Sequence, residues 1–209
     1  EVAMTTDTSL SFIHRFEPAR APGAAPLLLL HGTGGDEADL LPLGRAVSPN
    51  AALLSPRGRV LEGGMPRFFR RLSEGVFDEA DVRRRAGELA DFIAEARVAY
   101  GLPAPMALGF SNGANIAAAV LQLHPEALAG AVLLRAMVPL SDPPPADLTG
   151  KKILMLSGAV DPIVPSANST RLADIFTRQG AHVRHQVLPV GHGLSQADLS
   201  LTQAWLAAA

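Results

Sequence analysis

The sequence predicts an α/β fold built on one mostly parallel central sheet with helices on both faces. Short apolar runs bounded by Gly, Pro and Asp alternate along the chain with longer segments of helical spacing. Several of these runs are nearly all apolar, as expected of strands that helices cover on either side. We expect strands at residues 10–16, 26–31, 51–55, 105–110, 130–134, 152–157 and 182–188.

Four segments with helical patterns are available to cover this sheet. Residues 78–100 are amphipathic, with apolar side chains at helical spacing among arginines and glutamates, and Gly101 follows as a helix stop. Residues 112–123 are rich in alanine, and their lack of bulk allows close packing against a sheet. The last two helices are expected at 169–179 and 194–208.

Composition narrows the class of protein. The 209 residues, 48% of them hydrophobic and 18% charged, fit a single domain over 1–209, without internal repeats or a linker. A net charge of −2 gives no basic field for nucleic acid. The absence of cysteine excludes disulfides, a thiolate nucleophile and cysteine metal sites. We expect no metal and no cofactor.

The cellular setting is predicted from what the sequence lacks. No apolar run is long enough to span a bilayer, and the first residues show no leader pattern. We therefore expect a soluble, cytoplasmic protein that does not insert into membranes. We interpret Met4 as the natural first residue.

Residues 109–113 read Gly-Phe-Ser-Asn-Gly and match G-x-S-x-G, the nucleophile elbow of the α/β-hydrolase fold. In that turn a strand passes abruptly into a helix, and side chains at the two glycines would collide with neighbouring backbone. An ordinary Gly-rich turn is the alternative. The apolar run before the motif and the helical segment after it favour the elbow, with Ser111 as the nucleophile.

A serine hydroxyl needs a base to take its proton, and in this fold the acid and then the histidine follow the nucleophile. His182, His185 and His192 come late enough, but the first two lie inside a predicted strand. His192 lies in a loop between two glycines, which would let its imidazole approach Ser111. A solvated loop histidine is the alternative interpretation.

Four aspartates between the nucleophile and His192 are candidates for the acid: Asp142, Asp147, Asp161 and Asp174. Only Asp161 directly follows a strand, because the first two belong to a Pro-rich connection and the last lies within a helix. Its role would be to orient His192 and stabilise the imidazolium. An aspartate that only stabilises a turn is the alternative.

The oxyanion of the tetrahedral intermediate needs backbone donors. Residues 31–35, His-Gly-Thr-Gly-Gly, follow the strand 26–31 at the place of the fold's oxyanion loop. We assign the backbone amides of Thr33 and Asn112 to this role. A phosphate-binding loop is the rival interpretation, but the segment lacks the Lys-Ser/Thr ending.

Together these motifs resemble the phospholipase/carboxylesterase family of α/β-hydrolases, which is related to acyl-protein thioesterases. The resemblance extends to Leu-His-Gly-Thr-Gly-Gly-Asp at 30–36, Arg-Gly at 57–58 and Gly-Met-Pro-Arg-Phe-Phe-Arg-Arg at 64–71. These look like the bacterial branch of carboxylesterases and hydroquinone-specific hydrolases, which implies hydrolysis of small or aryl esters. Asn112 stands where acyl-protein thioesterases have Gln, and Thr33 where they have Leu, which argues against protein depalmitoylation.

The substrate pocket is predicted to be open. About seventeen residues separate the strands near 134 and 152, where many lipases insert a lid, so no lid domain is expected. Met65, Phe68 and Phe69 are candidates for the pocket wall, and core packing explains them nearly as well. The arginines within 67–71 are interpreted as a solvated basic edge, with contact to the substrate as the alternative.

The sequence therefore predicts a serine carboxylesterase that hydrolyses small, short-chain or aryl esters through an acyl-enzyme. The alternatives are a thioesterase or lysophospholipase acting on longer acyl chains, and a non-catalytic member that binds a small ligand. A third alternative is an interaction protein that acts through the Pro-rich segment 138–148. The expected partner is a small-molecule ester, and a homodimer is compatible with the resemblance.

Overall fold

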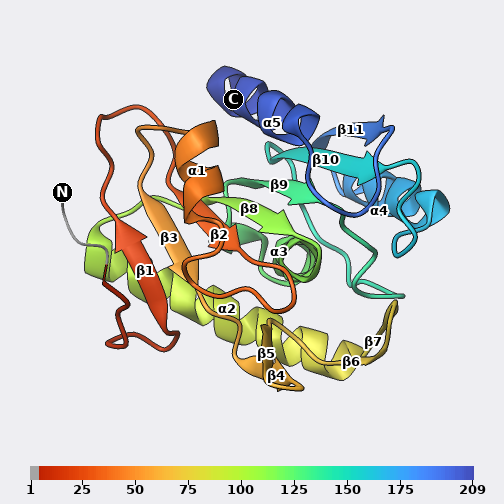
Figure 1. Cartoon of the computed structure of the whole chain (residues 1–209), viewed down its shortest axis with the longest axis horizontal. Coiled ribbons are helices and arrows are strands. Elements are labelled where there is room, and N and C mark those ends of the chain that lie inside the picture. Colours follow the sequence, from red (N-terminus) through yellow and green to blue (C-terminus); the bar gives the residue numbers. More distant parts are fainter. Residues whose placement is uncertain (1–4) are drawn as a thin grey trace.

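A seven-stranded sheet forms the centre of the computed structural model, which describes residues 5–209, so the interpretation of Met4 lies outside it (Figure 1). The strands run in the order β1-β3-β2-β8-β9-β10-β11, and every neighbouring pair is parallel except β1 and β3. Their bounds are β1 His14–Glu17, β2 Leu27–Leu30, β3 Leu53–Pro56, β8 Met106–Phe110, β9 Gly130–Leu134, β10 Lys152–Gly158 and β11 His182–Leu188. This confirms the predicted α/β class with a mostly parallel sheet.

Helices cover both faces of this sheet, as predicted. One face carries α2 (Glu79–Tyr100), α3 (Asn112–Leu123) and α4 (Ser166–Arg178), and the other carries α1 (Leu41–Val47) and α5 (Gln196–Ala208) (Figure 1). Successive residues of a strand point to opposite faces, so the buried leucines of β2 divide between two separate hydrophobic clusters. Because both faces of the strands are buried, apolar runs without a polar face are the sequence pattern that this sheet requires.

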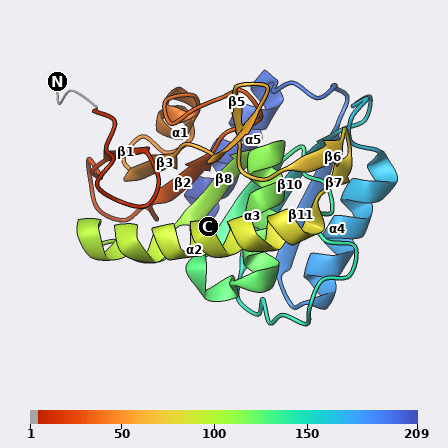
Figure 2. The same ribbon diagram turned by 90° about the horizontal axis from the view of Figure 1, so that it is seen from below.

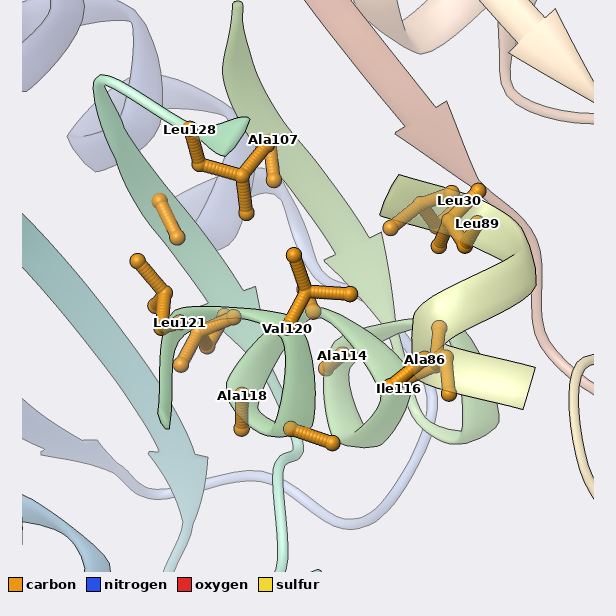
Figure 3. Packing of buried hydrophobic residues seen from close by; sticks show 14 of the residues in the cluster. Leu30, Ala86, Leu89, Ala107, Ala114, Ile116, Ala118, Val120, Leu121 and Leu128 are labelled. Carbon is orange, nitrogen blue, oxygen red and sulfur yellow. The ribbon is translucent and has the colours of Figure 1, made fainter. Parts of the chain in front are cut away.

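Helix α3 lies in the middle of one of these clusters. All of its residues except the last are buried, and Figure 3 shows its small side chains between the sheet and α2. Ile116 lies beside Ala86 of α2, whereas Val120 and Leu121 point toward the sheet. A helix that is apolar on all sides must be covered on all sides, so the start of α3 is held in place by packing.

Two short hairpins lie between β3 and α2, and neither was predicted. The first pairs β4 (Val60–Glu62) with β5 (Met65–Arg67), and the second pairs β6 (Arg71–Ser73) with β7 (Val76–Phe77). Figure 2 shows the second hairpin beside the first turns of α2. Strands of two or three residues carry too little periodicity to be recognised from sequence.

The predicted element bounds agree best where the pattern is long, although α4 begins three residues before the expected residue 169. Two larger differences lie near the N-terminus. Only His14–Glu17 of the strand expected from residue 10 is extended, because Phe12 turns into the core. Helix α1 was missed, since it has seven residues and begins with a proline in its first turn. Between Leu134 and Lys152 the chain forms neither helix nor strand, so the described part has no lid domain at this point. None of the described helices is long and apolar enough to cross a membrane.

Candidate active site

The nucleophile elbow has the geometry that its sequence predicts. Ser111 lies between β8 and α3 with a φ of 53°, in the left-handed region that L-residues rarely adopt. A Cβ atom at Gly109 would come within 2.6 Å of the carbonyl oxygen of Gly113, and one at Gly113 would overlap the carbonyl of Leu30 on β2. Both glycines are therefore sterically required, one by the start of the helix and one by the neighbouring strand.

A chain of hydrogen bonds links Ser111, His192 and Asp161. The Ser111 Oγ lies 2.9 Å from the His192 Nε2, and the His192 Nδ1 lies 2.8 Å from the Asp161 Oδ2. The His192 side chain is 21% exposed and that of Asp161 is fully buried. This arrangement has the order and spacing that proton transfer from a serine hydroxyl requires.

Asp161 is held in its charged form although it is buried. Burial acts against the charge, but hydrogen bonds from His192 and from the backbone amides of Ile163 and Val164 outweigh it, so the pKa of Asp161 is lowered. The two amides bind Oδ1 and leave Oδ2 for the imidazole. The carboxylate therefore fixes the orientation of the His192 ring.

The loop that carries His192 approaches the end of β10 because Gly158 has no side chain. A Cβ atom there would collide with the carbonyl oxygens of Val190 and Gly191. By contrast, a Cβ at Gly193 would meet nothing within 4 Å, and one at Gly191 would meet only the carbonyl oxygen of Val160, at 4.0 Å. The expectation that the two glycines beside His192 allow its approach is therefore wrong on steric grounds for both.

The other late histidines lie elsewhere. His185 binds the Ser157 hydroxyl at 2.9 Å across β10 and β11, and burial lowers its pKa. His182 begins β11, where it lines a separate surface depression with Trp205. Neither contacts Ser111, because the register of β11 places both within the sheet rather than in the loop after it.

The two proposed oxyanion donors meet where the strand order reverses. Leu30 and Gly109 are neighbours in register on the parallel strands β2 and β8, so the loops that follow them emerge side by side. Thr33 and Asn112 both line the cavity at Ser111. Within residues 5–209, neither backbone amide donates a hydrogen bond to a protein acceptor. In open α/β sheets such a switch point is the usual place for a ligand.

His31 shapes the loop that carries Thr33. Its Nδ1 donates to the Gly32 carbonyl oxygen at 2.7 Å, and its Nε2 accepts from the Gly58 amide at 2.9 Å. Burial lowers the pKa of His31, and the neutral ring is the form that these two bonds require. His31 therefore joins the loop after β2 to the segment after β3.

Asn112 joins the elbow to the two hairpins. Its side-chain Oδ1 accepts the backbone amide of Phe68 at 2.7 Å, and a further amide, that of Gly34, donates to the Pro66 carbonyl oxygen at 3.0 Å. The segment between the hairpins is thus fixed to both proposed oxyanion loops. The residue after the serine has a structural role that the sequence did not suggest.

A cavity of about 290 Å³ opens at Ser111. The residues that line it are Thr33, Arg67, Arg71, Glu74, Gly75, Phe77, Phe110, Ser111, Asn112, Asn115, Ile163 and His192. Five of them come from the two hairpins, which form one wall. The volume lies at the small end of the range for ligand sites, and the lining is largely polar.

The predicted pocket wall is wrong. Phe68 and Phe69 are 3% and 0% exposed and belong to the core, where Phe69 packs edge-on against Phe77. Met65 is 46% exposed and lies outside the cavity lining, beside Gly34. Both aromatic rings therefore turn into the core, while Arg67 lines the cavity.

The interpretation of 67–71 as a solvated basic edge is correct for Arg70 and wrong for its neighbours. Arg70 is 66% exposed and pairs with Asp78, whereas the Arg67 side chain is only 3% exposed. Arg67 donates to the Thr33 hydroxyl and to the Phe69 carbonyl oxygen, and Arg71 binds Glu62 at 3.0 Å. Two guanidinium groups therefore belong to the wall of the site.

Arg135 is a further residue of the site that the sequence did not reveal. It follows β9 with a φ of 61° and is fully buried. Its guanidinium donates to the carbonyl oxygens of Gly191 and Gly193, on either side of His192, and to both carboxylate oxygens of Asp198. The signal in the sequence is a single charge directly after an all-apolar strand.

No group of three or more His, Asp or Glu side chains in residues 5–209 is placed to hold a metal ion.

Comparisons with known proteins identify the family of the chain. The family described as Phospholipase/Carboxylesterase matches residues 13–209. MhqD of Bacillus subtilis (strain 168), a protein named as a hydrolase, is 45% identical over 181 residues, which are 86% of this chain and 90% of MhqD.

Two solved structures have nearly the same fold. The Bacillus cereus carboxylesterase is 42% identical with a TM-score of 0.93, over 96% of this chain and 95% of that one. The carboxylesterase from Mesorhizobium loti is 33% identical with a TM-score of 0.93, over 99% of both chains. The chain is therefore a member of the phospholipase/carboxylesterase family of α/β-hydrolases, as its motifs predicted.

Proposed function

We propose that this protein is a serine esterase that cleaves small carboxylic esters through a covalent acyl-enzyme. The observation that supports it most directly is the hydrogen-bonded series from Ser111 through His192 to the buried Asp161, at the mouth of a small cavity. Membership of a carboxylesterase family supports ester hydrolysis, and the hydrogen-bond geometry supports a serine nucleophile.

In the first half of the reaction the Ser111 Oγ attacks the ester carbonyl carbon while His192 Nε2 takes the hydroxyl proton. Negative charge develops on the former carbonyl oxygen, and the amides of Thr33 and Asn112 donate to it. Collapse of the tetrahedral intermediate breaks the bond to the alcohol oxygen, which receives the proton from the imidazolium. Asp161 stabilises that imidazolium throughout.

In the second half a water molecule attacks the acyl-enzyme, with His192 again as the base. The new tetrahedral intermediate expels the Ser111 oxygen, which is reprotonated by His192, and the carboxylic acid leaves. One water is consumed, and one alcohol and one acid are produced.

The size and polarity of the cavity favour small substrates. A volume of about 290 Å³ holds a short acyl group or one aromatic ring, and the guanidinium groups in its wall are poor neighbours for a long alkyl chain. These features argue against a lysophospholipase or a thioesterase for long acyl chains.

The test is hydrolysis of p-nitrophenyl esters from acetate to palmitate by the wild type and Ser111→Ala. We expect turnover by the wild type with an optimum at about four carbons or fewer, and a loss of at least about 10³-fold in the variant. An optimum at long chains would contradict the small-ester proposal. Equal inertness of both proteins on every ester would instead favour a ligand-binding member of the fold.

A further inference from the structure

The geometry points to a carboxylate-binding subsite inside the cavity, formed by Arg67 and Arg71, which makes small esters bearing a second, ionised carboxylate the preferred substrates. This inference rests on the proposed esterase function and names the class of substrate within it. The argument depends on which guanidinium nitrogens already have partners, on how much charge near them is compensated, and on where they face.

Arg67 is a buried cation whose charge is only weakly compensated by a carboxylate. Its side chain is 3% exposed, and its two hydrogen bonds go to neutral oxygens, the hydroxyl of Thr33 and the carbonyl of Phe69. The nearest carboxylate oxygen, on Glu62, is 4.0 Å from Nε. A charge removed from water needs a counter-charge or several strong hydrogen bonds, and Arg67 has an incomplete set.

Arg71 brings a second guanidinium to the same wall. Its Nε binds the Glu62 carboxylate at 3.0 Å. The same carboxylate is the one near Arg67, and it lies beside the Nε atom of both arginines. Among residues 5–209, neither Nη2 of Arg67 nor either Nη of Arg71 donates to a protein atom. These nitrogens are the ones left for a ligand.

The pKa of Arg67 agrees with a role in binding an anion. Burial and the nearby charge of Arg71 lower the pKa of Arg67 to about 10, against a partial opposite effect of Glu62. Arg67 therefore remains charged at neutral pH, and each positive charge destabilises the other. An anion bound between them would relieve both effects.

One carboxylate in the wall acts against an anionic ligand. Glu74 lines the cavity from the exposed turn between β6 and β7, where water surrounds it and screens its charge. The two arginines are more buried than Glu74, so water screens their charges less, and it screens the charge of Arg67 least. The net preference of the inner cavity is therefore for negative charge.

The position of the subsite sets the distance between the two groups of the substrate. Arg67 touches the side chain of Thr33, whose backbone amide is a proposed oxyanion donor, so a carboxylate on Arg67 lies close to the reacting carbonyl. A substrate with a short carbon chain or one aromatic ring between the ester and the carboxylate fits the cavity volume.

Two matched pairs of esters test the subsite. In the first pair, 4-acetoxybenzoate, which carries a carboxylate on its alcohol side, is compared with the neutral ester 4-methylphenyl acetate. In the second pair, monomethyl succinate, which carries a carboxylate on its acyl side, is compared with the neutral ester methyl butyrate. The kcat/KM of each ester is measured for the wild type, Arg71→Gln and Arg70→Gln, and because each ester is compared with itself across the three proteins, its intrinsic reactivity cancels.

Arg71→Gln removes a charge from the cavity. Because the Arg71 side chain is only half-buried, we expect the variant to fold. Arg70→Gln removes the same charge one residue away, on an exposed side chain outside the cavity. In at least one of the two pairs, we expect Arg71→Gln to lower kcat/KM for the carboxylate ester about tenfold more than for the neutral ester. Arg70→Gln should change both members equally, within about twofold.

Binding of succinate gives a readout that does not need turnover. Isothermal titration of succinate into the wild type should detect binding that is about tenfold weaker in Arg71→Gln and unchanged in Arg70→Gln. Unchanged ester ratios in both pairs, together with succinate affinity that does not respond to Arg71→Gln, would overturn the subsite. Absence of all ester hydrolysis with intact succinate binding would instead count against the esterase proposal alone.

Discussion

Arg135 and Asp198 form a bidentate ion pair in which both distances are 2.8 Å and the side chains are 0% and 2% exposed. The Nε of Arg135 donates to the carbonyl oxygen of Gly191, and Nη2, which also binds Asp198, donates to the carbonyl oxygen of Gly193. The pair therefore connects the start of α5 to the loop that carries His192. A buried pair of this kind contributes little net stability compared with apolar residues, but breaking it is costly.

Replacing Arg135 by Met should destabilise the protein by about 3 kcal/mol, because the buried carboxylate of Asp198 then lacks a positive charge beside it. It should also lower kcat, because the carbonyls on either side of His192 lose their donors. Urea unfolding and p-nitrophenyl acetate turnover measure the two effects.

The double variant Arg135→Met/Asp198→Asn separates stability from positioning. The introduced asparagine is neutral and can still accept from Ser195 at the start of α5, so part of the lost stability should return. The low kcat should persist, since the loop remains without its donors. Recovery of kcat in step with stability would show that Arg135 does not position His192.

Gly113→Ala should prevent folding or destabilise the protein by more than about 4 kcal/mol. The added methyl group overlaps the carbonyl of Leu30 in β2, and neither α3 nor the sheet can move away, because both are packed on all sides. Soluble yield and thermal unfolding provide the measurement.

Gly193→Ala is the matched control for this substitution. It lies in the other loop of the site, where a Cβ meets nothing within 4 Å, so a change of less than about 1 kcal/mol is expected. Equal tolerance of both substitutions would mean that β2 and α3 are farther apart than described.

Asp161→Asn should lower kcat by about 10³–10⁴-fold and leave the fold intact. The amide oxygen can keep the bonds from Ile163 and Val164, but its NH₂ group would donate to Nδ1 and move the imidazole proton to Nε2. The ring could then no longer accept the proton of Ser111. Asp174→Asn, which removes the same charge from an exposed position on α4, should keep full activity.

The ion pair between Glu37 and Arg57 predicts an acid-dependent loss of stability. The hydrogen bonds from Arg57 lower the pKa of Glu37 from 4.5 to about 2. Because the folded-state pKa lies below the unfolded one, the stabilisation is present above the unfolded value of 4.5 and is lost as the pH falls toward 2. Allowing for solvent around the half-exposed Arg57, its size is about 1–2 kcal/mol.

Comparison with Glu37→Gln isolates this contribution from other acidic groups. The melting temperature of the variant should lie below that of the wild type by a constant amount above about pH 5.5, and the two should converge toward about pH 2. A difference that stays constant across the whole acidic range would show that the pair does not stabilise the fold.

The parts of the fold that sequence predicts well are those specified by local pattern. Residues 130–134, 182–188 and 112–123 form elements with the bounds expected, because apolar runs and alanine-rich helical spacing are local properties. The order of Ser111, Asp161 and His192 followed from the order of the loops, and the structure brings the three side chains together. Their chemical roles stay a prediction.

The parts that sequence does not predict depend on contacts between distant segments. Arg67 looks like a surface residue within a basic run, and only the Thr33 hydroxyl and the packing of the hairpins show that it is buried. The charge of Arg135 is paired with that of Asp198, which lies 63 residues away in the sequence. Hairpins with two- or three-residue strands are fixed by partners such as Asn112, not by their own pattern.

The segment between β3 and α2 forms one wall of the cavity, opposite the loops that carry the proposed catalytic groups. The loops after β2 and β8 and the loop of His192 carry these groups, whereas residues 60–77 supply five of the twelve residues that line the cavity. The backbone of this segment is hydrogen-bonded to Asn112 and Gly34, so a change of length would disturb the loops that hold the proposed oxyanion donors. Exchanging only the side chains of 60–77 that line the cavity should therefore alter selectivity while Ser111 stays in place.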